Sequence, residues 1–197
     1  MVEQDASRTT TENRQKAIAA AACTLIAERG FEGLRTRDIA ERVGINVATL
    51  HYHVPTKQAL VRLVAQSLRE DFVAQHTRRP REGLSAAARL DLEFEDFRDL
   101  FATGRQLLTV MAELALRATR DGEVAAEILP MQARWHGQIA GLLAEGRADG
   151  SFRPDLDPEA AATIVVGAMT ACLRQPAGGL DHLECVFAQL RRAIIRS

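Results

Sequence analysis

The chain has 197 residues, of which 47% are hydrophobic and 26% charged, enough for one or two domains with a buried core. Its formal net charge is −1, so no global positive field draws it onto nucleic acid, and any DNA contact must come from a local surface. The low aromatic content of 5% and the lack of alternating apolar residues argue against β-structure and predict an all-α fold.

The amino-terminal segment and the cysteines indicate where the protein works. Residues 1–14 are polar and contain no apolar signal region, and no segment is long and uncharged enough to span a bilayer. Cys23, Cys172 and Cys185 lie in apolar surroundings at no metal-ligand spacing, so we expect free, buried thiols. These features predict a soluble, cytoplasmic protein without a membrane partner.

The apolar spacing is helical throughout, after residues 1–10, which we expect to form a disordered arm. Pro130 should kink or divide the helix that contains it, because proline lacks a backbone N–H. About nine helices are expected: residues 11–29, two short helices within 36–54, then 57–75, 84–101, 105–118, 121–146, 157–175 and 181–194.

The two short helices have signals for their beginnings and ends. Thr36 is expected to cap the first helix, and Gly44 can take the left-handed conformation that stops it. Asn46 should cap the second helix, which carries Leu50 inward. Val54 precedes a proline and is therefore pushed out of helical geometry. Two short helices joined by such a turn are a helix-turn-helix.

The composition of the second short helix separates this interpretation from its alternative, an ordinary pair of core helices. The outward residues Ala48 and Thr49 are small or polar, and His51, Tyr52 and His53 follow them. Such a face can enter the major groove of DNA without a clash. The sequence therefore favours a DNA-reading helix.

Two charged clusters are candidates for further sites. The basic segment 78–81 could contact phosphate, but a solvated turn is the favoured interpretation. The carboxylates between residues 91 and 99 could form a metal or acid–base cluster, but no histidine shares their spacing. We therefore expect them to form a solvated acidic face.

Residues 11–60 resemble the TetR family of bacterial transcriptional repressors. The resemblance depends on Gly30-Phe31, Thr36, Ile39-Ala40, Val43-Gly44-Ile45, Thr49-Leu50 and Pro55-Thr56-Lys57 with Leu60. The chain departs from the family pattern at His51, where tyrosine is usual, and at Val54, where phenylalanine is usual. The resemblance implies a helix-turn-helix domain over residues 11–56 and a helical domain for effector binding and dimerisation over residues 57–197.

The resemblance also implies a division of the DNA contacts among these helices. Phosphates should be contacted by Thr36, Arg37 and Lys57. Base edges should be met by Val47, Ala48 and Thr49, of which Thr49 can offer both a methyl group and a hydroxyl. The complete expected interface is Thr36, Arg37, Asn46, Val47, Ala48, Thr49, His51, Tyr52, His53 and Lys57.

By the same resemblance, two copies should form a homodimer on a palindromic operator, with half-sites about one helical turn apart or a multiple of it. The expected dimer residues are Ile164, Gly167, Ala168, Ala171, Leu183, Phe187 and Leu190. The alternative is that these apolar faces close the core of the single chain.

A small, largely apolar effector should bind in the helical domain, shift the helix at 57–75 and release the DNA. Its expected contacts are Leu63, Phe97, Phe101, Met111, Leu114, Met131, Trp135, His136 and Gln138, although for each of these residues taken alone plain core is the favoured interpretation.

Two other functions are alternatives to a repressor. An all-α enzyme is one of them, but the sequence contains no Gly-rich phosphate loop, nucleophile elbow or His-Glu-x-x-His motif. We expect no catalytic residue, no metal and no cofactor. The second is a helical sensor or adaptor that uses the helix-turn-helix to bind protein.

Overall fold

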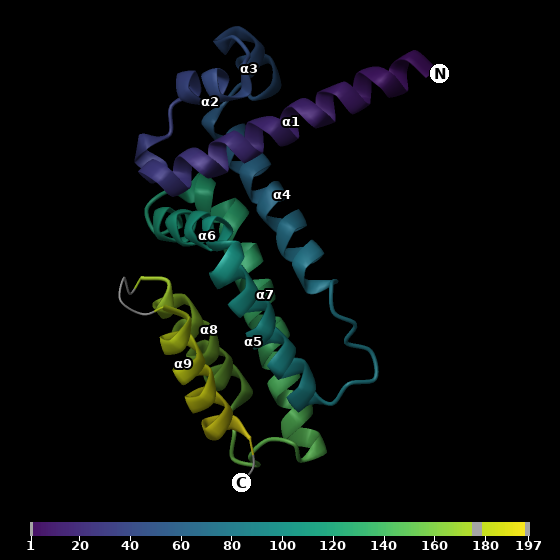
Figure 1. Cartoon of the computed structure of the whole chain (residues 1–197), viewed down its shortest axis with the longest axis vertical. Coiled ribbons are helices and arrows are strands. Elements are labelled where there is room, and N and C mark those ends of the chain that lie inside the picture. Colours follow the sequence, from purple (N-terminus) through teal and green to yellow (C-terminus); the bar gives the residue numbers. More distant parts are fainter. Residues whose placement is uncertain (1, 175–178, 196–197) are drawn as a thin grey trace. The chain divides into compact units, whose positions relative to one another are not determined.

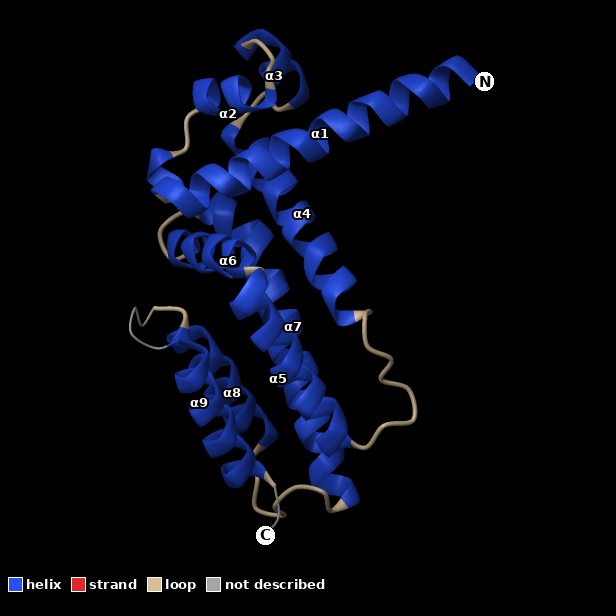
Figure 2. Ribbon diagram, in the orientation of Figure 1, coloured by secondary structure: helices blue, strands red, loops and turns tan. Residues whose placement is uncertain are grey.

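The computed structural model describes the backbone of residues 2–174 and 179–195 and the side chains of residues 11–174 and 179–195. Within these residues it contains nine α-helices, one short 3₁₀ helix and no named strand, and this confirms the expected all-α fold (Figures 1 and 2). The helices are α1 (Val2–Arg29), α2 (Thr36–Val43), α3 (Val47–His53), α4 (Lys57–His76), α5 (Ala86–Thr103), α6 (Arg105–Ala118), α7 (Gly122–Asp149), α8 (Pro158–Cys172) and α9 (Gly179–Ile194), with the 3₁₀ helix η1 at Phe31–Gly33.

Several expected helix boundaries are confirmed by backbone geometry and hydrogen bonds. Gly44 follows α2 in the left-handed conformation, with φ 71° and ψ 37°. At the start of α4, the Thr56 hydroxyl accepts from the N–H of Ala59 at 3.0 Å. At the start of α8, the Asp157 carboxylate accepts from the N–H of Ala160 at 3.0 Å. Local sequence chemistry therefore determines where these helices begin and end.

Other boundaries differ from expectation. The residue before α2 is Arg35, which makes no side-chain capping bond, so Thr36 is the first helical residue and not a cap. Backbone from Val2 onward is helical, so α1 includes most of the expected disordered arm; no glycine or proline interrupts it before Gly30. α7 continues as one helix through Pro130. α8 ends at Cys172, and part of its expected end lies outside the described residues.

The chain divides into two compact units, and these differ from the two domains expected on either side of a boundary at residue 57. The first comprises Met1–Val73 and Thr109–Leu129, and the second comprises Ala74–Leu108 and Pro130–Ser197. The first unit therefore combines α1–α3 with most of α4, most of α6 and the beginning of α7. The functional boundary at residue 57 remains a prediction, since it concerns DNA and effector binding and not compactness.

The core of the first unit forms where α1 packs on α2, α3 and η1. The side chains of Ile18, Leu25, Ile39 and Leu50 are each at most 1% exposed. Ile18 and Leu25 lie seven residues apart and so face the same side of α1. This burial fixes the short helices α2 and α3, which could not be stable alone.

The core of the second unit is built around stacked aromatic rings. Phe94 of α5 and Phe187 of α9 stack with centroids 4.6 Å apart, and Phe97 meets Phe187 edge-on at 6.4 Å. α9 also lies side by side with α8 (Figure 1). In α7, a Cβ atom at Gly146 would lie 2.1 Å from the Phe152 ring, so only glycine allows this ring to pack there.

Within the described part of the chain, no helix combines the length and the apolar character needed to cross a membrane.

Candidate nucleic-acid interface

The turn between α2 and α3 is anchored by buried apolar side chains. Ile39 and Ala40 of α2 and Leu50 of α3 are 0%, 2% and 1% exposed. In the turn, the N–H of Ile45 donates to the carbonyl of Ala40 at 2.9 Å. These contacts hold the two helices in a fixed relation, so the opposite face of α3 is presented as a rigid surface.

The opposite face of α3 is open to solvent in the chain. Tyr52 is 82% exposed and Val47 is 36% exposed, while Ala48 and His51 are also exposed. Thr49 and His53 are half-buried. The face carries no carboxylate, since the sequence of α3 contains no acidic residue. It is therefore accessible, and it contains no charge that would repel DNA phosphates.

The beginning of α3 is fixed by Asn46, whose side-chain oxygen accepts from the N–H of Thr49 at 2.7 Å. Asn46 itself is exposed. This bond satisfies one of the free N–H groups of the first turn. The expected cap is thus confirmed, and it places Asn46 at the edge of the same surface as Val47 and Ala48.

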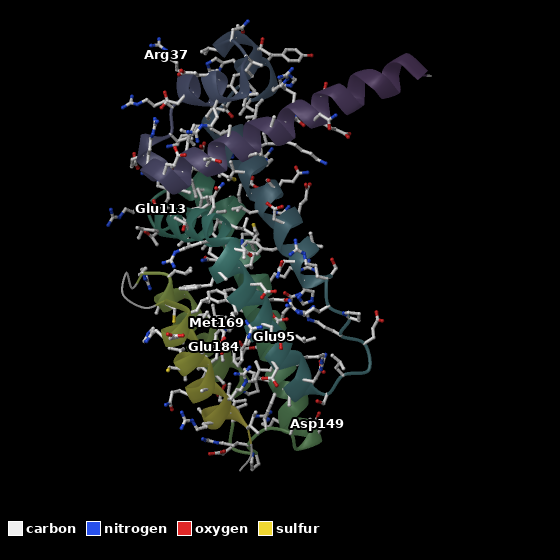
Figure 3. All side chains as sticks on the ribbon, viewed as in Figure 1. Arg37, Glu95, Glu113, Asp149, Met169 and Glu184 are labelled. Atoms are coloured by element: carbon white, nitrogen blue, oxygen red, sulfur yellow. The ribbon has the colours of Figure 1, made fainter. Side chains whose placement is uncertain are left out.

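The expected phosphate contacts lie at two helix beginnings. Thr36 and Arg37 begin α2 and are exposed, and in Figure 3 the Arg37 side chain points away from the ribbon. Lys57 begins α4 and is also exposed. A helix amino terminus carries partial positive charge, which adds to these cations. By contrast, Arg42 at the end of α2 is engaged by Glu28, with Nη2 and Oε2 3.0 Å apart.

Lys57 has neighbours that the sequence did not indicate. Its Nζ atom lies 3.8 Å from Oδ2 of Asp121 and 4.9 Å from the centroid of the Phe31 ring. These contacts join three segments that are distant in the sequence: η1, the beginning of α4 and the turn between α6 and α7. The side chain of Lys57 remains 56% exposed. The ion pair therefore constrains Lys57 only weakly, and its ammonium group remains accessible to solvent.

The expected effector residues are distributed over both compact units. The first unit contains Leu63 and Met111, which are half-buried, and Leu114, which is fully buried. In the second, the rings of Phe97 and Trp135 stack with centroids 6.5 Å apart, and Met131 and Trp135 are half-buried. Phe101 is buried, and Cζ of Arg105 lies 4.7 Å from the centroid of its ring.

The two expected polar contacts of the effector are placed differently from the apolar ones. Gln138 is exposed. The Nε2 atom of His136 lies 3.0 Å from the hydroxyl of Thr163, and its Nδ1 atom lies 3.6 Å from Oε2 of Glu159. His136 is thus engaged with α8. Gln138 thus faces solvent, and both ring nitrogens of His136 lie near a polar partner within the chain.

An open depression of about 350 Å³ lies on the first unit, between α1 and α2. It is lined by Arg14, Ala17, Ala20, Ala21, Thr24, Arg42 and Val43. None of these is an expected effector residue.

The expected dimer residues separate into two groups. On α8, Ile164 is 63% exposed and Gly167 is exposed, while Ala168 and Ala171 are half-buried. On α9, Leu183, Phe187 and Leu190 are 0%, 1% and 7% exposed within the single chain. These three close the core of their own unit, which is the alternative that the sequence left open. Of the expected dimer residues, those on α8 are therefore the ones that remain accessible in the single chain.

The charged clusters pair with each other instead of facing solvent. Asp96 of α5 is only 7% exposed and accepts hydrogen bonds from both Arg79 and Arg81. Arg79 also donates to Asp99 at 2.6 Å. The expectation of a solvated turn and a solvated acidic face is therefore wrong for Arg79, Arg81 and Asp96. Arg78 is exposed, and the side chains of Asp91, Glu95 and Asp99 remain 46%, 40% and 39% exposed. The signal in the sequence is a basic run at 78–81 followed by an acidic run at 91–99, near enough along the chain for the two to meet.

Burial within this charged cluster shifts two pKa values. Burial raises the pKa of Glu93, although the guanidinium of Arg81 opposes the shift. Burial and the charge of Arg81 lower the pKa of His76. The Nδ1 atom of His76 lies 3.5 Å from Oε1 of Glu93. In both side chains burial therefore favours the neutral form.

The cysteines are free, but only two of them are buried as expected. Burial raises the pKa of Cys23 to about 11 and also raises the pKa of Cys172. Cys185 is exposed, which corrects the expectation for this residue. Among the side chains that the structure describes, no group of three or more His, Cys, Asp or Glu could hold a metal ion.

Comparison with known proteins agrees with this arrangement. Residues 18–64 match the family model of bacterial regulatory proteins of the tetR family, and residues 94–176 match the model of the tetracyclin repressor-like C-terminal domain. The HTH-type transcriptional repressor KstR2 of Rhodococcus jostii is 25% identical over 140 residues, which cover 71% of this chain and 68% of that protein.

Solved structures share the fold at low sequence identity. A regulator from Saccharomonospora viridis in complex with choline has a TM-score of 0.83 and 22% identity, covering 94% of this chain and 100% of the other. AibR in complex with isovaleryl coenzyme A and operator DNA has a TM-score of 0.75 and 23% identity, covering 91% and 97%. With family models matched in both its amino-terminal and its carboxyl-terminal part, the chain belongs to the TetR family of bacterial transcriptional regulators.

Proposed function

We propose that the chain is a ligand-responsive transcriptional repressor of the cytoplasm, which binds a palindromic operator as a homodimer. The observation that carries this proposal is the solvent-open face of α3, held on a buried Leu50 and capped by Asn46. One side of α3 is buried against the core and the other is exposed. Such a helix suits the major groove, where each base pair presents a distinct pattern of hydrogen-bond donors and acceptors. The family to which the chain belongs consists of regulators and not of enzymes.

Base reading is assigned to Val47, Ala48 and Thr49. Their short side chains allow the axis of α3 to approach the floor of the groove. Val47 and Ala48 offer apolar contacts to a thymine methyl group, while Thr49 adds a hydroxyl. Because few hydrogen-bonding groups are present, part of the specificity comes from the shape of the DNA.

Backbone contacts are assigned to the residues around this centre. Thr36, Arg37 and Lys57 approach phosphates at the beginnings of α2 and α4, and Tyr52 and His53 do so at the end of α3. His51, which is exposed, is also assigned to the DNA backbone. Contacts of this kind fix the register of the protein on DNA and supply the salt-dependent part of the affinity.

Dimerisation is proposed through the exposed face of α8. Ile164, Gly167, Ala168 and Ala171 combine one large exposed apolar side chain with small residues, which allow a second helix to approach closely. A net charge of −1 makes a single copy a weak DNA binder. Two copies on one twofold axis would each occupy one half-site of a palindrome, one helical turn or a multiple apart.

Release is proposed to follow binding of a small, largely apolar effector in the helical domain. The stacked pair of Phe97 and Trp135, with Met131 on the same helix as Trp135, is the best-supported part of this site. Relatives of the same fold were solved with choline and with isovaleryl coenzyme A. The effector can shift the equilibrium only by its preference for the released state.

The test is a fluorescence-anisotropy titration of the protein with the promoter DNA beside its own gene, in the presence of excess random DNA. We expect specific binding with a stoichiometry of one dimer per palindrome. Analytical ultracentrifugation in the same buffer gives the oligomeric state of the free protein. If excess random DNA removes all binding to the promoter, the alternative function is favoured, in which the helix-turn-helix belongs to an adaptor that binds protein.

A further inference from the structure

Phe31 lies in a cluster of charged side chains within the first compact unit. Its ring is only 6% exposed. The Nζ atom of Lys57 lies 4.9 Å from the ring centroid, and Cζ of Arg117 lies 5.7 Å from it. Cations are attracted at such distances by the negative face of an aromatic ring. The buried ring thus brings a cation from α4 and a cation from α6 into one small region.

Asp121 supplies the negative charge of this cluster. Its Oδ2 atom lies 3.1 Å from Nε of Arg117 and 3.8 Å from Nζ of Lys57. Its Oδ1 atom accepts from the backbone N–H groups of Glu123 and Val124 at 3.2 and 3.3 Å. The hydrogen bond from Arg117, followed by that from Val124, keeps the pKa of Asp121 below its usual range. The carboxylate therefore stays ionised and fixed at the beginning of α7.

The two cations are held unequally. Arg117 is 29% exposed and also pairs with Glu32 of η1. Lys57 is 56% exposed, and its 3.8 Å distance from Asp121 is longer than a hydrogen bond. If Lys57 leaves, Asp121 keeps Arg117 and two backbone donors. Departure of the lysine therefore leaves no unpaired charge behind, which makes the exchange of its partner easy.

We propose that Asp121 competes with a DNA phosphate for Lys57, so that the corner between α6 and α7 controls how freely Lys57 can bind DNA. This rests on the proposed function, in which Lys57 contacts phosphate. Arg117, Asp121 and α3 belong to the same compact unit. A shift of the corner that brings Asp121 nearer to Lys57 weakens DNA binding while α3 keeps its conformation.

The test begins with Asp121→Asn, because the amide oxygen can still accept from Glu123 and Val124 while the charge is lost. The dissociation constant should fall about two- to fivefold, on operator and random DNA alike, as expected for loss of one exposed ion pair. The slope of log affinity against log salt should steepen by at most about one, since Lys57 no longer gives up an internal counterion.

Glu127→Gln is the matched control. It removes a carboxylate from α7, within the same unit and six residues after Asp121, but its partner is Arg62, with Nε and Oε1 3.0 Å apart. It should change neither the affinity nor the salt slope. An equal gain from Glu127→Gln would show a general effect of net charge and overturn the competition.

The second measurement combines Asp121→Asn with Lys57→Ala. Lys57→Ala alone should weaken binding to all DNA and lower the salt slope by about one. In that background Asp121→Asn should have no effect. If Lys57→Ala weakens binding but Asp121→Asn does not tighten it, the competition is overturned and the proposed function stands. If Lys57→Ala leaves binding unchanged, the phosphate contact and the competition are both overturned.

Discussion

The side-chain oxygen of Asn46 accepts a hydrogen bond from the N–H of Thr49, so the cap of α3 and a residue assigned to base reading lie in one turn. Asn46→Ala should therefore destabilise the helix-turn-helix by about 0.5–2 kcal/mol. Thermal unfolding followed by circular dichroism measures this loss. Asn46→Asp separates the two roles, because aspartate caps equally well but adds a negative charge. It should retain stability and weaken DNA binding; unchanged binding by this variant would place Asn46 away from the phosphates.

Thr49 and Arg37 should respond differently to the choice of DNA. Thr49→Ala removes a methyl group and a hydroxyl from the centre of α3, and should cost about 1–3 kcal/mol on the operator alone. Arg37→Ala removes a phosphate contact, and should weaken operator and random DNA about equally while lowering the salt slope by about one. Anisotropy titrations on both DNAs measure these effects. An equal loss on both DNAs for Thr49→Ala would argue against base readout.

Gly146 and Gly141 lie in the same helix but in different surroundings. A Cβ atom at Gly146 would overlap the buried Phe152 ring, so Gly146→Ala should destabilise the protein by about 1–3 kcal/mol. Nothing lies within 4 Å of a Cβ atom at Gly141. Gly141→Ala should therefore stabilise the protein by about 0.5–1 kcal/mol, because alanine favours the helix. Urea unfolding compares the two variants, and similar effects would contradict the packing of Phe152 against α7.

Glu93 should make a measurable contribution to the pH dependence of stability. Burial raises its pKa above 4.5, so the folded chain binds this proton more tightly than the unfolded chain. The stability contributed by the proton is fully present below pH 4.5, and is lost as pH rises through the raised pKa. Glu93→Gln should therefore increase the free energy of unfolding at pH 7.5 more than at pH 4.5.

The control for this prediction is Glu95→Gln, which removes a more exposed carboxylate of the same helix; the side chains are 40% and 16% exposed for Glu95 and Glu93. Its effect on the free energy of unfolding should be small, because an exposed ion pair contributes little to stability. Urea unfolding at both pH values measures both variants. A Glu93→Gln protein that is less stable at pH 7.5 would show that its pairing with Arg81 outweighs its burial.

The parts of the fold that the sequence predicted are those determined by local chemistry. Asn46, Thr56 and Asp157 cap helices because each can reach an N–H group three residues later. Leu50 was expected to point inward from the second short helix, and its side chain is 1% exposed. Thr36 was misplaced by one position because helix ends are the least certain part of any pattern.

The parts that the sequence did not predict depend on partners distant in the chain. α9 is apolar on the face that packs on Phe94, and its pattern alone could not tell that face from a surface for a second subunit. To predict the pairing of Asp96 with Arg79 and Arg81, one would have to know the path of the chain between α4 and α5. The contact of Lys57 with Asp121 joins the beginning of α4 to the turn between α6 and α7, and it has no local signal in the sequence.

The difference in exposure among the three cysteines makes the protein ready for spectroscopic labelling without mutagenesis. Cys23 and Cys172 are buried and their raised pKa values keep them as thiols, so they react slowly with maleimides. Cys185 on α9 is exposed and should take one probe per chain. A nitroxide attached there would report, by the distances between paired spins, on whether two chains associate and how DNA or an effector rearranges them.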